Sequence, residues 1–313
     1  MENEQTIKQE RANTAPQAAA APQPARPAAT PTETKPAENE LQLHCLAPED
    51  LHAEMQRLKD EEHFDFLETL TGMDWGEDGL GVVYNLWSTT QNKRISLKTA
   101  TTDRENPFLP TVSDLWNIAN IYEREVFDFF GIKFLGHPDM RRIFLREDWN
   151  GYPMRKDDKP EEENPLRMDN EPLADVTTQY DRQADGSITT KENTIFTEDD
   201  YVVNIGPQHP STHGVLHFRV ALEGERIRKI DPILGYIHRG IEKLNESLTY
   251  PQTLALTERL DYLGAMQNRH ALCMCIEKAA GIEVSERVQY IRTIMDEFQR
   301  IDSHILFFSC LCQ

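Results

Sequence analysis

The sequence has little of several features that mark particular classes of protein. Its 313 residues include five cysteines, an odd and unevenly placed set that argues against a secreted disulfide framework. No run approaches the roughly 18 apolar residues of a membrane-spanning helix. Positive charge is also scarce, with 33 Lys and Arg against 53 Asp and Glu. Because phosphate recognition needs a basic surface, general nucleic-acid binding is excluded.

Short catalytic signatures are missing as well. The sequence contains neither a glycine-rich phosphate loop nor a GxSxG nucleophile elbow. Residues 1–40 contain ten alanines and six prolines, and their only larger apolar side chains are Met1 and Ile7. Because so little apolar surface cannot offset the entropy of ordering, residues 1–40 are predicted to form a disordered arm.

Residues 41–159 show the pattern of a small α+β domain. Apolar and polar residues alternate on both sides of a polar stretch at 89–92, which predicts a β-hairpin between 82 and 97. Ser113 is placed to cap a helix. A shorter helix after Pro48 is predicted from three apolar residues at helical spacing, namely Leu51, Met55 and Leu58.

The sequence changes character after residue 159. Residues 160–200 carry twelve acidic and three basic residues without a sustained hydrophobic period, which is typical of a solvated acidic linker or of a segment that wraps around a neighbouring domain. Within 201–313, alternating apolar residues predict a hairpin that turns at Gly224, followed by long helices over 252–280 and from Ser285 onward. The predicted fold class is α+β, with a small N-terminal α+β domain and then a β-hairpin that leads into a mainly helical domain.

The densest group of turn-forming and titratable residues is GPQHPSTHG at 206–214. His209, His213 and His217 are four residues apart, a spacing that raises the question of a metal site. Pro210 breaks any helix that would align them, and four residues along a strand separate side chains by about 13 Å, too far for one zinc ion. No metal is therefore predicted. The alternatives are a turn whose histidines bond the backbone and a loop that meets a ligand.

Two CxC pairs lie inside the predicted helices, Cys273 with Cys275 and Cys310 with Cys312. Residues two apart on a helix point about 200° away from each other, so neither pair can hold one metal ion. Burial as small apolar residues is the favoured interpretation of all four.

Several stretches resemble two subunits, C and D, of bacterial respiratory complex I, the proton-translocating NADH-quinone oxidoreductase. Resemblance to the C subunit lies in EREVFDFFGIKFLGHPDMRRI at 123–143 and DWNGYPMRKD at 148–157. Resemblance to the D subunit lies in GPQHPSTHGVLHF at 206–218, IHRGIEKLNE at 237–246 and TERLDYLGAMQNRHA at 257–271. The chain is therefore similar to the fused C/D subunit, with a C-like part over 41–159 and the N-terminal part of a D-like domain over 201–313. The family continues well past Gln313, so we expect the sequence to be cut within the D-like part.

The resemblance implies a fold and a site for residues 201–313. The D subunit is similar in fold to the large subunit of nickel-iron hydrogenases, with a cavity for a quinone headgroup in place of the metal site. His213 and Tyr262 match the two positions that bracket this headgroup, and an imidazole and a phenol are suitable proton donors to its two carbonyl oxygens. His209, His238 and Arg239 are expected around them.

The resemblance also implies cofactors, partners and a location. Quinone is the expected substrate, and electrons are expected from an iron–sulfur cluster on a partner subunit, because this chain lacks a cysteine set with cluster spacing. The expected partners are the subunit that carries the terminal iron–sulfur cluster and the membrane-arm subunit at the quinone channel. The chain is expected to be a peripheral subunit on the cytoplasmic side of the inner membrane, active only within the complex.

Two other functions compete with this interpretation. The large subunit of a membrane-bound nickel-iron hydrogenase shares much of the pattern, but it needs two CxxC pairs to hold its metals. Where the first pair is expected, after Glu258 and Arg259, this chain has Asp261 and Gly264. The second alternative is a non-catalytic scaffold. It suits residues 41–160, which contain no reactive constellation, better than it suits the D-like part.

Overall fold

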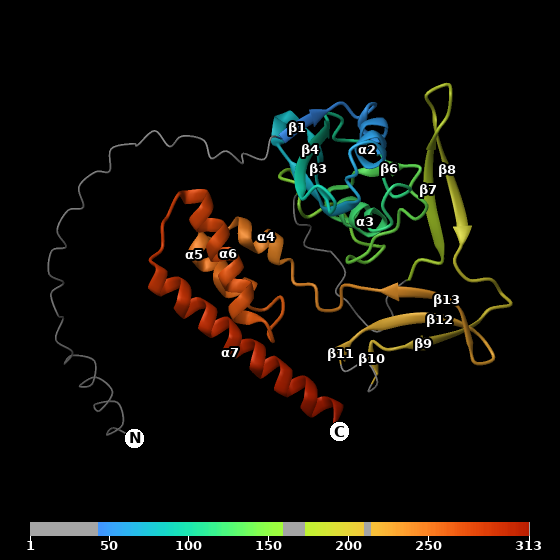
Figure 1. Cartoon of the computed structure of the whole chain (residues 1–313). Helices are drawn as coiled ribbons and strands as arrows, with labels where there is room; N and C mark the ends of the chain where they lie inside the picture. Colours follow the sequence, from blue (N-terminus) through green and yellow to red (C-terminus); the bar gives the residue numbers. More distant parts are fainter. Residues whose placement is uncertain (1–42, 159–172, 210–213, 313) are drawn as a thin grey trace, which may run out of the picture. The chain divides into compact units, whose positions relative to one another are not determined.

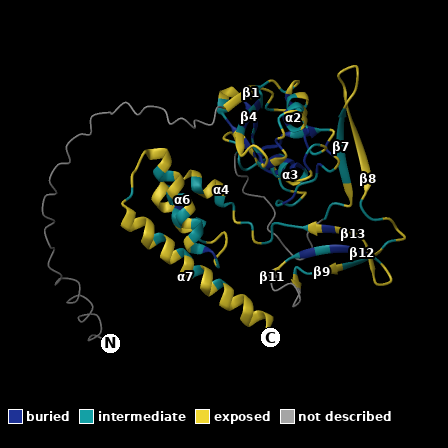
Figure 2. Cartoon of the chain, viewed as in Figure 1, coloured by how far each residue is buried: buried dark blue, intermediate teal, exposed yellow. Residues whose placement is uncertain are grey.

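The computed structural model describes residues 43–158, 173–209 and 214–312, all within one compact unit, Leu41–Gln313 (Figure 1). Helices and several β-sheets are both present, which confirms the predicted mixture of α and β structure. The buried apolar side chains lie almost wholly between Leu51 and Ile143 (Figure 2). The main hydrophobic core therefore belongs to the first half of the chain.

The first half is organised around a four-stranded sheet in the order β1-β4-β3-β2. Its strands are β1 Leu43–Leu46, β2 Phe66–Asp74, β3 Leu80–Ser88 and β4 Lys93–Thr101, and the short 3₁₀ helix η1 Gly76–Asp78 lies between β2 and β3. β1 runs parallel to β4, and the other neighbours are antiparallel. The hairpin predicted between 82 and 97 is thus confirmed as β3 and β4, whose alternation buries Val82, Tyr84 and Leu86.

Two helices complete this core. Helix α2, Leu51–Asp60, buries Leu51, Met55 and Leu58 as predicted. Helix α3, Ala119–Phe130, begins later than expected, because residues 113–118 form turns. Ser113 does not cap the helix. Its hydroxyl lies 2.7 Å from the hydroxyl of Thr111, so local side-chain bonding competes with helix initiation.

A second sheet has four strands in the order β5-β6-β7-β8. They are β5 Phe108–Pro110, β6 Lys133–Leu135, β7 Val176–Arg182 and β8 Ile188–Thr194. Within 160–200, where a solvated linker was predicted, β7 and β8 form an antiparallel hairpin. The missed signal is the Asp185-Gly186 turn, in which Gly186 has a φ of 85°. Tyr180 of β7 packs edge-on against Phe108, with ring centroids 5.9 Å apart.

The D-like part begins with a three-stranded antiparallel sheet in the order β13-β12-β9. Its strands are β9 Tyr201–Ile205, β12 His217–Glu223 and β13 Arg226–Ile233. The predicted hairpin with its turn at Gly224 is confirmed, since Glu223 pairs with Arg226. Between β9 and β12, the short strands β10 Gln208–His209 and β11 Gly214–Val215 pair antiparallel.

Helices follow, namely α4 Ile241–Glu246, α5 Tyr250–Thr257, α6 Ala265–Ala280 and α7 Glu286–Leu311. The prediction of one helix over 252–280 is wrong, because α5 and α6 are separated by a turn. At this turn the Asp261 carboxylate accepts the N–H of Leu263 at 3.0 Å, and Gly264 stands at the start of α6. An aspartate that bonds the nearby backbone favours such a turn over a continued helix.

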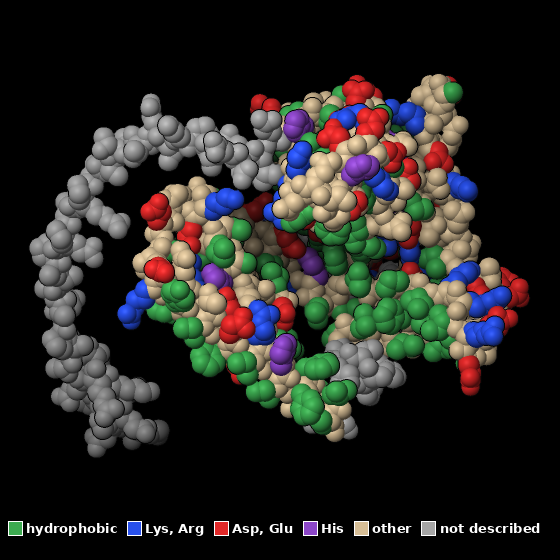
Figure 3. Space-filling model, in the orientation of Figure 1, with side chains coloured by type: hydrophobic (Ala, Val, Ile, Leu, Met, Phe, Trp, Pro, Cys, Tyr) green, Lys and Arg blue, Asp and Glu red, His purple; other side chains and the backbone are tan. Residues whose placement is uncertain are grey.

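Helices α6 and α7 bury none of their side chains within the described residues. Ile291, Phe298 and Ile305 on α7 are 48 to 60% exposed, and hydrophobic side chains line this helix in Figure 3. The predicted burial of the cysteines is not observed, since Cys275, Cys310 and Cys312 are exposed and Cys273 is only partly covered. The cause is that α7 packs chiefly on α6, which leaves its other faces uncovered. Among the described helices, none has the length and apolarity needed to cross a membrane.

Candidate functional site

The histidine-containing loop is only partly described. β10 and β11 pair antiparallel, with His209 opposite Gly214. His213 itself lies outside the described residues, as does the side chain of His209. His217 is 7% exposed, and its ring nitrogens lie 2.9 Å from the Tyr236 hydroxyl and 3.3 Å from Asn204 Oδ1. His217 is therefore a side chain held between Asn204 of β9 and Tyr236, which follows β13.

Tyr262 lies on the turn between α5 and α6. Two side chains hold this turn, because Gln299 Nε2 of α7 donates to the Leu263 carbonyl at 3.0 Å and Asn268 Nδ2 donates to the Asp261 carbonyl at 3.3 Å. The phenol of Tyr262 is 79% exposed. The local structure thus presents this hydroxyl outward on an anchored turn, where it can meet a ligand.

His238 and Arg239 lie just before α4. The imidazole of His238 stacks on two aromatic rings of the first half, with centroids 5.3 Å from Phe129 and 5.0 Å from Phe144. Its Nδ1 accepts the N–H of Gly240 at 3.4 Å. Arg239 is exposed. His238 thus attaches the D-like part to α3, and the described structure does not bring Tyr262 into this contact.

The helix that carries the ERE motif has charged side chains where a core helix normally has apolar ones. Glu123 is fully buried, and its carboxyl group accepts the Thr111 hydroxyl at 2.5 Å and the Val112 N–H at 2.7 Å. The guanidinium of Arg124 donates to the carbonyls of Arg141 and Arg142 at 3.1 and 3.0 Å. The motif therefore fixes the segments before and after α3.

Asp128 clamps the loop that follows β6. One of its oxygens accepts the backbone N–H groups of Ile143, Phe144 and Leu145 at 3.2, 2.8 and 3.0 Å. The other accepts Arg142 Nη1 at 2.9 Å. Charged groups in an apolar helix need partners when buried, so charge at these positions was a signal that could have predicted the clamp.

Burial controls the protonation of two groups beside α3. It raises the pKa of Glu123 to about 8 and lowers the pKa of His137 to about 4. His137 Nε2 lies 3.1 Å from the Asn120 carbonyl, and its Nδ1 accepts the N–H of Asp139 at 3.0 Å, which assigns the neutral Nε2–H tautomer. The Nε2 atom is 4.0 Å from Glu123, so two neutral groups face each other at neutral pH.

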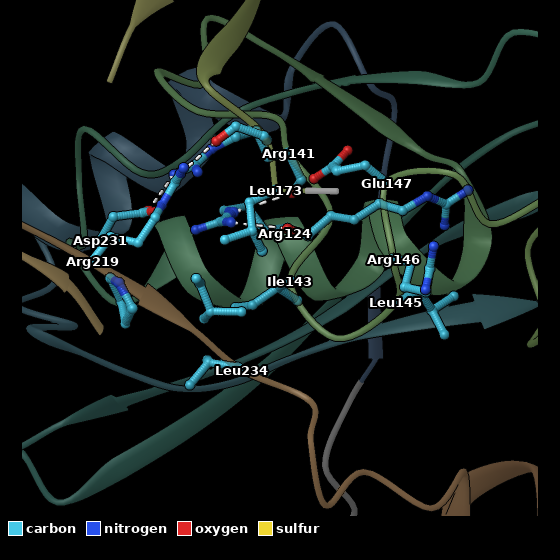
Figure 4. Close-up of a pocket in the computed structure, with 14 residues that line it drawn as sticks. Arg124, Arg141, Ile143, Leu145, Arg146, Glu147, Leu173, Arg219, Asp231 and Leu234 are labelled. Atoms are coloured by element: carbon cyan, nitrogen blue, oxygen red, sulfur yellow. Dashed lines mark hydrogen bonds and ion pairs between the residues drawn. The ribbon is translucent and has the colours of Figure 1, made fainter. Parts of the chain in front are cut away.

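A cluster of buried ion pairs joins the C-like part to β12 and β13 (Figure 4). Asp231 accepts Arg141 Nη2 at 3.1 Å and Arg219 Nη2 at 2.7 Å, and Arg141 forms a bidentate pair with Asp139 at 2.7 Å. Burial opposes ionisation of Asp139, but the hydrogen bonds from Arg141 and the positive charges of Arg124 and Arg141 together outweigh it and lower the pKa of Asp139. The adjoining cavity is about 50 Å³, with room for little more than water. The cluster is therefore structural.

Comparisons with known proteins place this chain among relatives. Residues 45–164 match the family model described as respiratory-chain NADH dehydrogenase, 30 Kd subunit. A NADH-quinone oxidoreductase C/D subunit from Bacteroides fragilis is 64% identical over 280 residues, which are 86% of this chain and 53% of that protein. The C/D subunit from Bacteroides thetaiotaomicron is 66% identical over the same shares. Over most of its length the chain is thus closely similar to C/D subunits of NADH-quinone oxidoreductases.

The C/D relatives are longer than this chain. A C/D subunit from Phocaeicola vulgatus is 67% identical over 267 residues, which are 85% of this chain and 51% of that protein. The chain thus spans about half the length of the curated relatives it matches. The 30 Kd family match includes all of α3 and the loop clamped by Asp128. The buried charged side chains of α3 are therefore part of the region that the 30 Kd family model matches.

Proposed function

We propose that the chain is part of a peripheral-arm subunit of a proton-translocating NADH-quinone oxidoreductase and is active only within that complex. The single observation that supports this most strongly is the 64 to 67% identity to C/D subunits of NADH-quinone oxidoreductases over 85 to 86% of the chain. Its substrate is quinone, and its D-like part has the fold of a nickel-iron hydrogenase large subunit. The chain lies on the cytoplasmic side of the inner membrane and reaches the membrane through its partners.

His213 and Tyr262 deliver protons to the quinone in this proposal. Reduction takes two electrons and two protons, and each residue serves one carbonyl oxygen of the headgroup. Tyr262 is suited to this because its phenol can donate a proton and Gln299 anchors the turn that carries it. His209 and Arg239 lie around the site, while the stacked His238 holds the chain that leads into α4.

Electrons enter from an iron–sulfur cluster on a partner subunit, because side chains of this chain donate protons but do not carry electrons. Within the described ranges, His, Cys, Asp and Glu form no group of three that could hold a metal ion. The membrane-arm subunit at the quinone channel is the second partner. Asp261 accepts a backbone N–H where a hydrogenase has a metal-binding thiolate, which supports the quinone function over nickel-iron chemistry.

The C-like part acts as a scaffold. Three of its buried charged side chains, Glu123, Asp128 and Arg124, are engaged with backbone atoms. Groups engaged in this way position loops and are not free to react. The ion pairs of Asp231 extend this scaffold to the hairpin of the D-like part.

The proton-delivery proposal is tested by Tyr262→Phe and His213→Ala in the assembled complex. Each is expected to lower the rate of quinone reduction, with a loss of about 2 to 4 kcal/mol of transition-state stabilisation. Electron transfer to an artificial acceptor upstream of the quinone is expected to continue. Tyr290→Phe is a matched control, because Tyr290 is also an exposed tyrosine of the helical region, at 64%. Full quinone turnover in an assembled Tyr262→Phe/His213→Ala double variant would show that the site lies elsewhere.

A further inference from the structure

A groove with an apolar floor lies between α3 and α4. It consists of two adjoining cavities, each of about 320 Å³, which share Phe129, Met154 and Glu242 among their lining residues. Neither cavity is lined by Tyr262 or by the ion pairs of Asp231. We name it the α3–α4 groove, and the functions proposed above do not use it.

The floor of the α3–α4 groove is firmly packed. Val126, Phe129 and Phe130 of α3 are only 2 to 8% exposed, so they offer the edges of side chains already fixed in the core. A Cβ atom on Gly72 of β2 would lie 2.5 Å from the Phe130 ring, which shows how closely that ring approaches the sheet. A fixed apolar surface of this kind favours binding, because little side-chain entropy remains to be lost.

The wall of the groove is acidic in the second cavity, where Glu125, Glu242 and Glu246 lie. Burial raises the pKa of Glu125 on α3, and the nearby carboxylate of Glu242 raises it further. Glu242 lies 3.5 Å from His238 Nε2, and Glu246 is paired with Lys243 at 3.0 Å. Glu125, by contrast, forms no ion pair or hydrogen bond with any residue in the described ranges. Glu125 and Glu242 therefore line the same cavity, near enough for the second carboxylate to act on the first.

The two cavities differ in charge, because Arg146 and Lys243 line the first beside Glu242, whereas the second is mainly acidic. Its lining contains Lys156 and four carboxylates, of which Asp74 is neutralised by Arg104 at 2.8 Å. An uncharged ligand would fill the apolar floor but would desolvate Glu125 further without giving it a partner, which costs free energy. A ligand that combines an apolar group with a cation satisfies both the floor and the wall.

We propose that the α3–α4 groove receives a segment of a partner polypeptide in which a lysine or arginine stands beside a bulky apolar side chain. The apolar side chain contacts Phe129 and Met154, and the cation lies between Glu125 and Glu242. Two cavities in a row suit an extended segment that covers both. This inference rests on the proposed assembly into a larger complex, but it is independent of the quinone chemistry.

The test places a photo-reactive benzoylphenylalanine at position 156, because Lys156 is exposed and lines the groove. The assembled complex is isolated and illuminated, and the cross-linked peptide is sequenced by mass spectrometry. Assembly is verified first on a native gel, so a failure of the complex to form is distinguished from an empty groove. The expected product joins this chain to a segment of another subunit that contains a lysine or arginine next to an apolar residue.

Charge reversal then tests the role of the acidic wall. Glu242→Lys is expected to lower the cross-link yield by about tenfold or more, because it opposes like charges at an interface. Glu77→Lys is the matched control, since Glu77 is an exposed glutamate that does not line the groove. Changing the partner's basic residue to glutamate in the Glu242→Lys background is expected to restore the yield.

Three results overturn the proposal. They are cross-links confined to this chain or to a second copy of it, a partner segment without a basic residue, and an unchanged yield in the Glu242→Lys variant of a complex that assembles.

Discussion

Replacing Glu123 by glutamine is expected to remove a pH dependence from the stability of the C-like part. Burial raises the pKa of Glu123 from 4.5 to about 8, so between these pH values the folded state holds a proton that the unfolded state has released. Stability contributed by this proton therefore falls as the pH rises from about 4.5 to about 8. His137 acts in the opposite direction. Its pKa is lowered from 6.5 to about 4, so the unfolded state alone binds its proton in that range and stability rises with pH.

The two opposing effects leave a range of pH in which only one of them changes the stability. They cancel approximately between pH 4.5 and 6.5, and only the Glu123 effect remains between pH 6.5 and 8. Each pH unit over which the folded state alone holds one proton is worth about 1.4 kcal/mol. The free energy of unfolding is therefore expected to fall by about 2 kcal/mol from pH 6.5 to pH 8. Glutamine has no proton to lose, so the variant is expected to show no such fall.

The assay is urea denaturation followed by tryptophan fluorescence at pH 6.5 and pH 8. All four tryptophans lie in the first half, at 75, 87, 116 and 149, so the signal reports on that half alone. Glutamine fits the site, because its oxygen can accept the Val112 N–H and its amide can donate to the Thr111 hydroxyl. Glu77→Gln, at an exposed position, is expected to keep the wild-type slope. Equal slopes for wild type and Glu123→Gln would refute the reasoning.

Three further predictions concern packing. Asp128→Ala should lower the free energy of unfolding by about 2 to 4 kcal/mol in urea denaturation, because three backbone N–H groups lose their acceptor, and an unchanged midpoint would contradict the clamp. Asp231→Ala should cost about 2 to 4 kcal/mol by leaving Arg141 and Arg219 short of a partner, which thermal unfolding measures; Glu223→Ala, at the exposed pair with Arg228, should cost less than about 1 kcal/mol. Residues 201–313 expressed alone should bind a hydrophobic dye and melt without cooperativity, because α7 exposes apolar side chains; a sharp calorimetric transition would count against this.

Prediction from sequence succeeded where apolar residues recur at the spacing of one helix face and that face is buried. Leu51, Met55 and Leu58 have helical spacing, and all three are buried on α2. It failed where single polar side chains redirect the backbone. Ser113 bonds Thr111 rather than the helix, and the carboxylate of Asp261 makes a turn within the helix predicted over 252–280.

The acidic composition of 160–200 misled for a related reason. Mean charge describes how well a segment is solvated, but a hairpin needs only a turn and two pairing strands. The Asp185-Gly186 turn supplies the first, and one face of β7 is covered through Tyr180. Net charge was thus a poor guide to backbone structure here.

The candidate site shows a different limit. Residue identity at His213 and Tyr262 indicates chemistry, but local structure fixes only the backbone that carries Tyr262, whose side chain stays 79% exposed. A proton donor acts on a quinone only in a water-poor cavity, and an exposed turn does not make one. The interior of the C-like part differs in this respect, because Asp128 and Arg124 have their hydrogen-bond partners within the chain. Proton delivery by Tyr262 therefore requires surfaces outside the described residues, whereas the scaffold around α3 needs none.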